Sequence, residues 1–301
     1  MNAIETINLK KSYNGNQIAL SDTSFSIKQG EIFGFLGSNG AGKTTTVRLL
    51  NGILEPSGGN ASVMGMDITK NQVEIHKLCG VMTETALMYE NLSGIENLNF
   101  FGRLHGMSEA AIRERSFVLL EYLELTDAKN KKVKAYSTGM KRRLSIARAL
   151  LHSPKVLFLD EPTSGLDPEA AMNVTKMIKQ LSVEQGVTVF LCTHQLKYAE
   201  EICTLYGFIH KGRMLGMGTF DELLKQRNSK RYVEIRGESL PDIKSSELTH
   251  EGKIRITIQS DDDVTRILQD ILSRGGKVYE ARQVKWNLED LYFSFQKGEN
   301  L

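Results

Sequence analysis

The stretch of sequence that decides the fold is Gly37-Ser38-Asn39-Gly40-Ala41-Gly42-Lys43-Thr44, near the start of a chain of 301 residues. It matches the pattern G-x-x-x-x-G-K-[S/T] of a phosphate-binding loop. An apolar segment, residues 32–36, precedes it, and a helical pattern over residues 44–51 follows it. The bare pattern arises by chance in about 1% of chains of this length. The strand–loop–helix setting therefore favours a phosphate-binding loop.

The residue types of this loop fit the chemistry of a nucleoside triphosphate. Its glycines let successive backbone N–H groups turn toward phosphate oxygens, and the helix that starts near Lys43 points its positive end at them. Lys43 is predicted to reach the β- and γ-phosphates, and the Thr44 hydroxyl is predicted to ligate Mg²⁺. The predicted phosphate-binding residues are Gly37, Ser38, Asn39, Gly40, Ala41, Gly42, Lys43, Thr44 and Thr45.

Two acidic residues end a second apolar segment. Residues 156–159 are apolar and run into Asp160 and Glu161. Ligands in an open parallel sheet bind beyond the carboxyl ends of the strands, so we expect both carboxylates to face the phosphate site. Asp160 is predicted to hold Mg²⁺, directly or through water, and Glu161 to orient and deprotonate the attacking water. Such a pair alone is more often a solvated strand end, and the phosphate loop upstream reverses that preference.

The hydrophobic pattern of residues 1–225 predicts an α/β domain. Residues 4–13 and 18–27 alternate apolar and polar side chains, as half-buried strands do, and Asn14-Gly15 between them is a tight-turn signal. Further along the chain, apolar strands alternate with helices. This order is typical of a mostly parallel sheet that is covered on both faces.

A change of pattern near residue 226 predicts a second, small α+β domain over residues 226–301. Short alternating strands surround one helix there, and Asn287 is predicted to cap a last amphipathic helix. Within the first domain, Ser93 and Glu96 form a predicted capping box at the start of a helix. We expect a helical subdomain over about residues 85–152.

Composition narrows the classes of function. The 38 basic and 36 acidic residues give a formal net charge of +2, which argues against bulk electrostatic binding to nucleic acid. Cys79, Cys192 and Cys203 are far apart and odd in number, so neither a disulfide framework nor a zinc site is predicted. No apolar run approaches the ~18 residues of a membrane span. If the protein works at a membrane, we expect another chain to supply the spans.

Further motifs resemble those of the ATP-binding-cassette (ABC) ATPases. The family signature, usually L-S-G-G-Q before a helix, is matched by Tyr-Ser-Thr-Gly-Met at residues 136–140. Residues 162–167, Pro-Thr-Ser-Gly-Leu-Asp, resemble the family's D-loop. His194 follows an apolar strand, where the family has its switch histidine, and Tyr13 stands where an aromatic side chain stacks on adenine. These features keep the family's order across residues 1–220.

The resemblance implies a P-loop ABC ATPase core, which is a parallel sheet with an antiparallel N-terminal β subdomain and a helical subdomain. It implies hydrolysis of ATP with Mg²⁺. The signature in this family serves the ATP held by the opposite subunit, so the resemblance implies a head-to-tail homodimer or heterodimer with ATP at its interface. The implied catalytic residues are Glu161 and His194, and the implied further ATP-binding residues are Tyr13, Ser137, Gly139 and Asp167.

The implied partner is a polytopic membrane permease on a separate chain, with this chain peripheral at the cytoplasmic face and without nucleic acid. Thr138 and Met140 of the signature, and Leu288-Glu289-Asp290 near the end, resemble the type-2 exporters of drugs, sodium, antibiotics or polysaccharides. Export is therefore the favoured direction. Glu84 aligns with the glutamine of the family's Q-loop and is predicted to ligate Mg²⁺.

Several of these motifs also have plainer interpretations. Ser137 fits a simple N-cap, and Asp167-Pro168 fits a helix start. Lys141, Arg142 and Arg143 are predicted to form a solvated helix face. Two other functions stay open. A soluble ABC ATPase acting on ribosomes or DNA is disfavoured by the single set of motifs and the lack of long heptad repeats. A non-hydrolysing binding module is disfavoured by Glu161.

Overall fold

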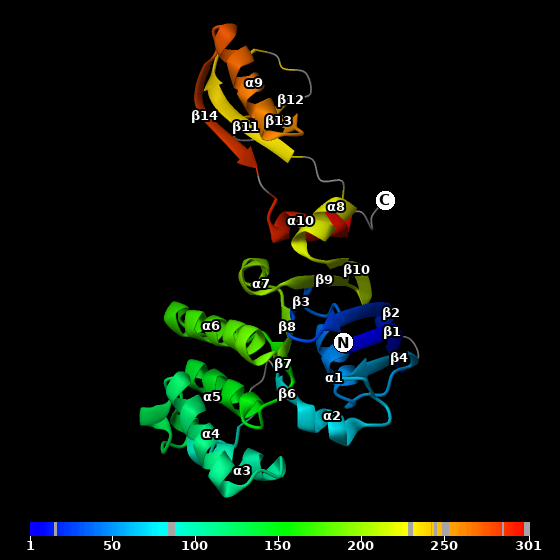
Figure 1. Ribbon diagram of the computed structural model, residues 1–301, viewed down its shortest axis with the longest axis vertical. Helices are drawn as coiled ribbons and strands as arrows, with labels where there is room; N and C mark the ends of the chain where they lie inside the picture. Colours follow the sequence, from blue (N-terminus) through cyan, green and yellow to red (C-terminus); the bar gives the residue numbers. More distant parts are fainter. Residues whose placement is uncertain are drawn as a thin grey trace. The chain divides into compact units, whose positions relative to one another are not determined.

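The computed structural model describes residues 1–14, 17–83, 88–227, 231–241, 243, 246–248, 253–284 and 286–297. The chain divides into two compact units, Met1–Phe220 and Asp221–Leu301 (Figure 1). The division falls before the predicted boundary at 225/226, which lies at the end of helix α8 (Phe220–Gln226). Among the helices of the described part of the chain, none has both the length and the apolar composition of a membrane-spanning segment.

A six-stranded sheet in the order β10-β9-β3-β8-β7-β6 forms the centre of the first unit. Its strands are β3 (Ile32–Leu36), β6 (Cys79–Met82), β7 (Val156–Asp160), β8 (Thr188–Thr193), β9 (Leu205–His210) and β10 (Arg213–Gly218). Strands β6, β7, β8, β3 and β9 are parallel, and β10 pairs antiparallel with β9. Every residue of β3, β7 and β8 is buried, as the unbroken apolar runs predict.

The neighbours β3, β8 and β7 bring three distant motifs to one edge. Because the three strands are parallel, their carboxyl ends lie together. The phosphate loop follows β3, Asp160 ends β7, and His194 follows β8. The strand order therefore explains how segments far apart in sequence meet at one site.

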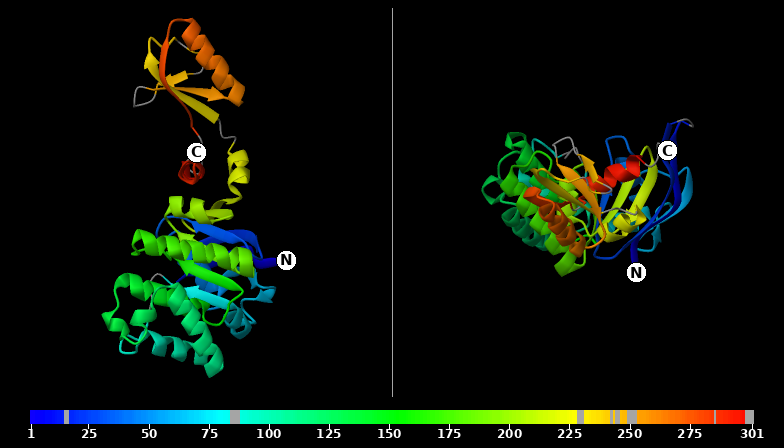
Figure 2. Two further views of the ribbon diagram at one scale, coloured as in Figure 1. Left: turned by 60° about the vertical axis from the view of Figure 1, so that its left-hand side comes forward. Right: turned by 90° about the horizontal axis from the view of Figure 1, so that it is seen from above.

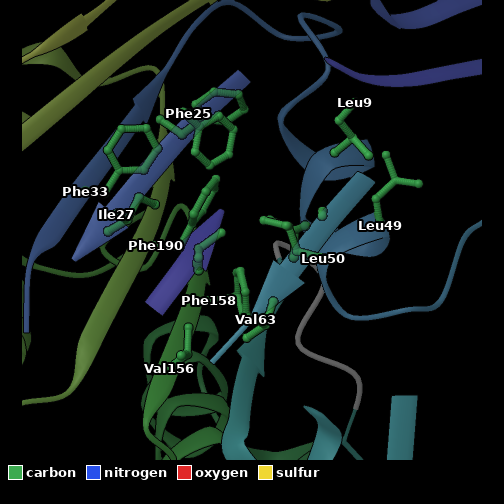
Figure 3. Packing of buried hydrophobic residues seen from close by; sticks show 14 of the residues in the cluster. Leu9, Phe25, Ile27, Phe33, Leu49, Leu50, Val63, Val156, Phe158 and Phe190 are labelled. Carbon is green, nitrogen blue, oxygen red and sulfur yellow. The ribbon is translucent and has the colours of Figure 1, made fainter. Parts of the chain in front are cut away.

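A second sheet of the first unit is antiparallel, in the order β2-β1-β4-β5. Its strands are β1 (Asn2–Tyr13), β2 (Gln17–Lys28), β4 (Gly58–Val63) and β5 (Met66–Asp67). Buried aromatic rings join the two sheets: Phe25 of β2 stacks on Phe33 of β3 with ring centroids 5.6 Å apart, and Phe190 of β8 lies 5.2 Å from Phe33 (Figure 3). The predicted antiparallel N-terminal pair is confirmed. Gly15, half of the predicted turn, lies outside the described residues.

Seven α-helices of the first unit surround the sheets within the described ranges. They are α1 (Lys43–Leu50), α2 (Gln72–Leu78), α3 (Gly94–Leu104), α4 (Glu109–Tyr122), α5 (Thr138–Leu150), α6 (Pro168–Gln185) and α7 (Leu196–Ile202). Figures 1 and 2 show α3, α4 and α5 gathered in one lobe, away from the antiparallel strands. The capping box at the start of α3 is confirmed, since the Ser93 hydroxyl accepts from Glu96 N and the Glu96 carboxylate accepts from Ser93 N.

The second unit contains an antiparallel sheet with α9 packed on one face. Its sheet has the order β12-β13-β11-β14, and Val233, Ile235, Ile256, Ile258 and Ile271 form its small core. The elements after α8 are β11 (Arg231–Glu238), β12 (Ser246–Leu248), β13 (Ile254–Ile258), α9 (Asp261–Ser273), β14 (Lys277–Val284) and α10 (Leu288–Lys297). The predicted cap at Asn287 is confirmed, because its side-chain oxygen accepts from Asp290 N at 2.8 Å.

Candidate functional site

The phosphate loop is a tight backbone turn between β3 and α1. Gly42 has φ +113°, and a Cβ there would lie 2.6 Å from the carbonyl oxygen of Ala19, so only glycine fits without strain. Gly42 is also the N-cap of α1, and no side chain caps that helix. The first N–H groups of α1 are therefore available to an anion, which the positive end of the helix favours.

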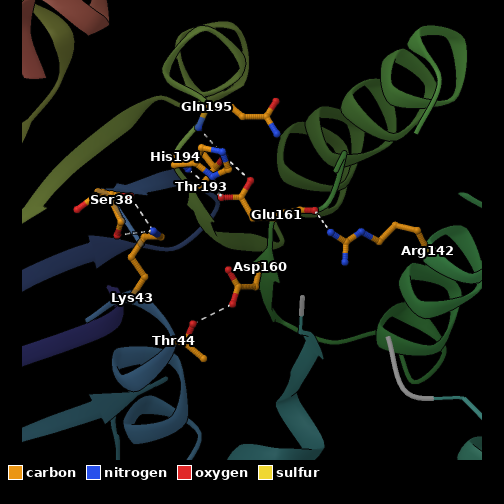
Figure 4. Close-up of polar contacts among 10 residues, drawn as sticks. Ser38, Lys43, Thr44, Arg142, Asp160, Glu161, Thr193, His194 and Gln195 are labelled. Carbon is orange, nitrogen blue, oxygen red and sulfur yellow. Dashed lines mark hydrogen bonds and ion pairs between the residues drawn. The ribbon is translucent and has the colours of Figure 1, made fainter. Parts of the chain in front are cut away.

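Lys43 is buried inside this loop. Its Nζ donates to the carbonyl oxygens of Gly37, at 2.6 Å, and Ser38, at 3.1 Å (Figure 4). The two bonds hold the ammonium group within the turn of the loop rather than in solvent. A phosphate group in the cradle would meet the glycine N–H groups and this fixed positive charge together.

Thr44 and Asp160 connect the loop to the end of β7. The Thr44 hydroxyl donates to Asp160 Oδ2 at 3.1 Å. A hydroxyl and a carboxylate side by side are the hard oxygen ligands that Mg²⁺ takes in phosphate-binding sites, where waters and phosphate oxygens complete its shell. These two side chains therefore fit the predicted metal site. Among the described residues no cluster of three or more His, Cys, Asp or Glu side chains could hold a metal by itself.

Glu161 follows in a strained backbone conformation, and both oxygens of its carboxylate accept hydrogen bonds. Its φ is +50°, in the left-handed region that residues with a Cβ seldom adopt. Oε2 accepts from the Thr193 hydroxyl at 2.9 Å, and Oε1 accepts from the His194 N–H at 2.9 Å and from His194 Nδ1 at 2.6 Å. The hydrogen bond to Oε1 puts a proton on Nδ1. Three donors from the end of β8 thus fix the direction of the carboxylate at the sheet edge.

Arg142 contradicts the sequence analysis, which placed it on a solvated helix face. It is 6% exposed, and its Nη2 donates to the backbone oxygen of Glu161 (Figure 4). Its neighbours lie differently: Lys141 pairs with Glu90, and Arg143 donates to the Leu123 carbonyl and Glu124. The Lys141 side chain is 31% exposed and that of Arg143 is 16% exposed, so the three basic residues do not form the solvated helix face that was predicted.

A cavity of about 480 Å³ lies at this edge. Its lining residues are Tyr13, Gln17, Ile18, Ala19, Asn39, Gly40, Gly42, Lys43, Thr44, Thr45, Asp160, Glu161, Ser164 and His194. The predicted Tyr13 lies at the end of β1, with its hydroxyl 3.5 Å from Thr45 Oγ1. Gln17, Ile18 and Ala19 of β2 were not predicted, because an alternating strand pattern alone does not single them out. Thr193 was not predicted either, although it directly precedes His194.

Six predicted residues within the described chain lie outside the cavity lining: Gly37, Ser38 and Ala41 of the phosphate loop, and Ser137, Gly139 and Asp167 farther along the chain. Ser137 caps α5 by accepting from Met140 N at 3.2 Å, and Asp167 caps α6 by accepting from Ala170 N at 2.9 Å. The bond from Ala170 N holds the pKa of Asp167 below its usual value. The signature and the D-loop touch each other, since Gly139 lies beside Gly165 and Leu166. The plainer capping roles are therefore present in the chain.

Glu84 lies outside the described residues. The three cysteines are buried and free, and burial raises the pKa of Cys192, which lies beside Asp160 on the neighbouring strand.

Known proteins share both the sequence pattern and the fold of this chain. The family model for ABC transporters matches residues 20–164. The daunorubicin/doxorubicin resistance ATP-binding protein DrrA of Streptomyces peucetius is 38% identical over 265 residues, which is 88% of this chain and 79% of that protein. The bacitracin transport ATP-binding protein BcrA of Bacillus licheniformis is 41% identical over 234 residues, 77% of this chain and 74% of that protein.

Similarity extends into the second unit and to solved structures. An uncharacterized ABC transporter ATP-binding protein, YhcH of Bacillus subtilis, is 34% identical over 294 residues, 96% of this chain and 94% of that protein. A solved ATP-binding subunit of an ABC transporter superimposes with a TM-score of 0.71 at 30% identity, over 75% of this chain and 93% of that one. The structure of cbiO1 from Clostridium perfringens superimposes with a TM-score of 0.67 at 28% identity, over 75% of this chain and 92% of that one.

Proposed function

Because the chain belongs to the ABC transporter family as an ATP-hydrolysing, ATP-binding subunit, we propose that it powers the export of a drug or antibiotic through a permease on a separate chain. The observation that carries this proposal is the assembled edge of the central sheet, where Lys43, the Thr44–Asp160 pair and Glu161 line one cavity. The relatives named for daunorubicin resistance and bacitracin transport supply the class of cargo.

The phosphate loop holds the triphosphate in this mechanism. Residues 37–45 surround the phosphates with backbone N–H groups, and Lys43 neutralises the β- and γ-phosphates. Tyr13, one of the residues that line the cavity, stacks on the adenine ring. Mg²⁺, held by Thr44 and Asp160, would offset the negative charge that develops on the transferring phosphoryl group.

Glu161 and His194 carry the reaction itself. Glu161 takes a proton from a water molecule as the water oxygen bonds to the γ-phosphorus and the bond to the ADP oxygen breaks. His194 donates to Glu161 through Nδ1, which leaves its Nε2 side for the γ-phosphate. The Thr193 hydroxyl and the His194 N–H keep the carboxylate aimed at that water.

Two chains complete each site. Ser137 and Gly139 stand at the N-terminus of α5, an anion-binding position, yet they do not line the cavity of their own chain. A head-to-tail pair would bring them to the γ-phosphate of the opposite chain, and Asp167 would lie at the same interface. ATP then closes the pair, and hydrolysis lets it open.

The permease docks beside the helical lobe. A cavity of about 280 Å³ opens there between the core and α3, and Ile53, Val81, Phe101 and Arg148 are among its lining residues. Next to it the exposed rings of Tyr89 and Phe100 pack at 4.8 Å. Exposed aromatic side chains beside a mostly apolar hollow fit a short amphipathic cytoplasmic segment of the permease.

Transport in inverted membrane vesicles tests this function. Vesicles that contain the full-length chain and its permease are given Mg·ATP and daunorubicin, and drug uptake is followed by fluorescence. We expect uptake with the wild-type chain and none with Glu161→Gln. Phe100→Ala is expected to keep ATPase activity in solution and to lose binding to the permease. An ATPase that neither binds the permease nor drives uptake would refute the proposal.

A further inference from the structure

Glu161 is also held by a hydrogen bond from α5, at its backbone and outside the cavity. Arg142, in the second turn of α5, reaches from the helical lobe to the backbone oxygen of Glu161 (Figure 4). The arginine is 6% exposed, so this contact is made away from bulk water. A buried guanidinium is costly unless it makes bonds that matter to the fold or to function.

The contact falls at a strained point of the backbone. Glu161 has φ +50°, a conformation that persists only where surrounding contacts hold it. Its N–H donates to the Cys192 oxygen at 2.9 Å, and its carbonyl oxygen accepts from Ser164 N at 3.1 Å as well as from Arg142. The N–H and the carbonyl oxygen of Glu161 thus each make a neutral backbone hydrogen bond. Arg142 adds a charge-assisted hydrogen bond to the carbonyl oxygen, and charge-assisted bonds are the stronger kind.

We propose that Arg142 is the positioning residue of Glu161. The proposal rests on the proposed function, in which Glu161 is the base. The guanidinium holds the peptide group that follows Glu161, and this peptide sets the direction in which the side chain leaves the backbone. Without it, the left-handed turn relaxes and the carboxylate leaves its donors Thr193 and His194. In the proposed function the phosphate loop and the Thr44–Asp160 pair bind Mg·ATP and Arg142 is not one of those ligands, so nucleotide binding continues.

Steady-state ATPase assays on the full-length chain test the proposal. Arg142→Gln and Arg142→Ala are expected to lower kcat roughly 10- to 100-fold, the effect of losing one hydrogen bond to a charged group, and to leave KM and ATP affinity within a few-fold. Arg142→Lys, which keeps the charge but not the planar fork, is expected to fall between these variants and wild type. Lys141→Ala removes the neighbouring charge on the same helix and is expected to match wild type.

A second readout separates positioning from stability. A variant that binds ATP but hydrolyses it slowly accumulates the ATP-bound dimer, so Arg142→Gln with Mg·ATP is expected to give more dimer on size exclusion than wild type. A merely structural arginine would instead lower ATP affinity, dimer and kcat together. That pattern in Arg142→Gln and Arg142→Lys, or wild-type kcat in both, overturns the proposal. Glu161→Gln is measured alongside: if it turns over normally, the assignment of the base has failed instead.

Discussion

The substitution Glu161→Gln replaces one carboxylate oxygen by an amide nitrogen, and we expect it to affect ATP hydrolysis far more than the stability of the fold. In the structure Oε1 accepts both bonds from His194, and Oε2 accepts the bond from the Thr193 hydroxyl. A glutamine keeps its oxygen in the first position and places its amide nitrogen in the second. The Thr193 hydroxyl can then accept instead of donate, because it has two lone pairs and accepts one other bond, from Gln195 N.

The energies of the two effects differ widely. One rearranged hydrogen bond in an intact network changes the free energy of unfolding by about 0.5–1.5 kcal/mol. Loss of a general base lowers a rate by roughly 10²- to 10⁴-fold, which corresponds to about 3–5 kcal/mol of activation free energy. We therefore expect Glu161→Gln to fold, to bind ATP and to lose turnover.

Three assays on one preparation check this expectation. Thermal melting measures the fold, titration with ATP measures binding, and phosphate release at saturating Mg·ATP measures kcat. The closed dimer is expected to persist with ATP, as seen by size exclusion. Multiple turnover within about tenfold of the wild-type rate, in a variant that binds ATP normally, would refute the assignment, since a true base contributes at least ~10²-fold.

Two further predictions concern stability. Gly42→Ala places a Cβ 2.6 Å from the Ala19 oxygen at φ +113°. We expect this substitution to lower the free energy of unfolding, measured in urea, by about 1–3 kcal/mol. Gly40→Ala, at φ +78° with open space around it, is the matched control, and an equal loss in both variants would show that the close approach does not matter. Burial lowers the pKa of His152 to about 4. The unfolded chain therefore takes up the proton first as the pH falls, and stability is expected to drop by about 1–2 kcal/mol, after allowance for solvent screening, between pH 6.5 and about 4. His152→Gln flattens that dependence in melts recorded across the range, and an unchanged slope would contradict it.

Much of the core of the site could be predicted because it follows local rules. The phosphate loop has a fixed pattern of glycines, and Asp160 and Glu161 end an apolar strand, so their position at the sheet edge follows from parallel pairing. The capping box of Ser93 and the cap at Asn287 depend on residues within one turn of helix. In each case the residues that form the feature lie within a few positions of one another or at the end of a single strand.

The buried contact of Arg142 with the backbone of Glu161 could not be predicted from the same rules, because the two residues are remote in sequence. Composition suggests a solvated run of Lys141, Arg142 and Arg143, yet Arg142 precedes the buried Ser145 and Ile146 by three and four residues and so shares their face. This helical spacing was the sequence signal that Arg142 is buried. The β2 residues that line the cavity belong to no sequence motif, and the pairing of β2 with β1 brings them beside Tyr13.

Mixing two defective chains measures most directly whether each ATP is hydrolysed between two chains. Lys43→Ala damages the phosphate loop and Ser137→Arg damages the signature, so each homodimer has a defect in both sites. A heterodimer of the two has one intact site and one site with both defects, if Ser137 acts on the opposite chain. We expect the ATPase activity of the mixture to rise well above that of either variant alone. Heterodimers demonstrated by differential tags, with no rise in activity, would contradict it.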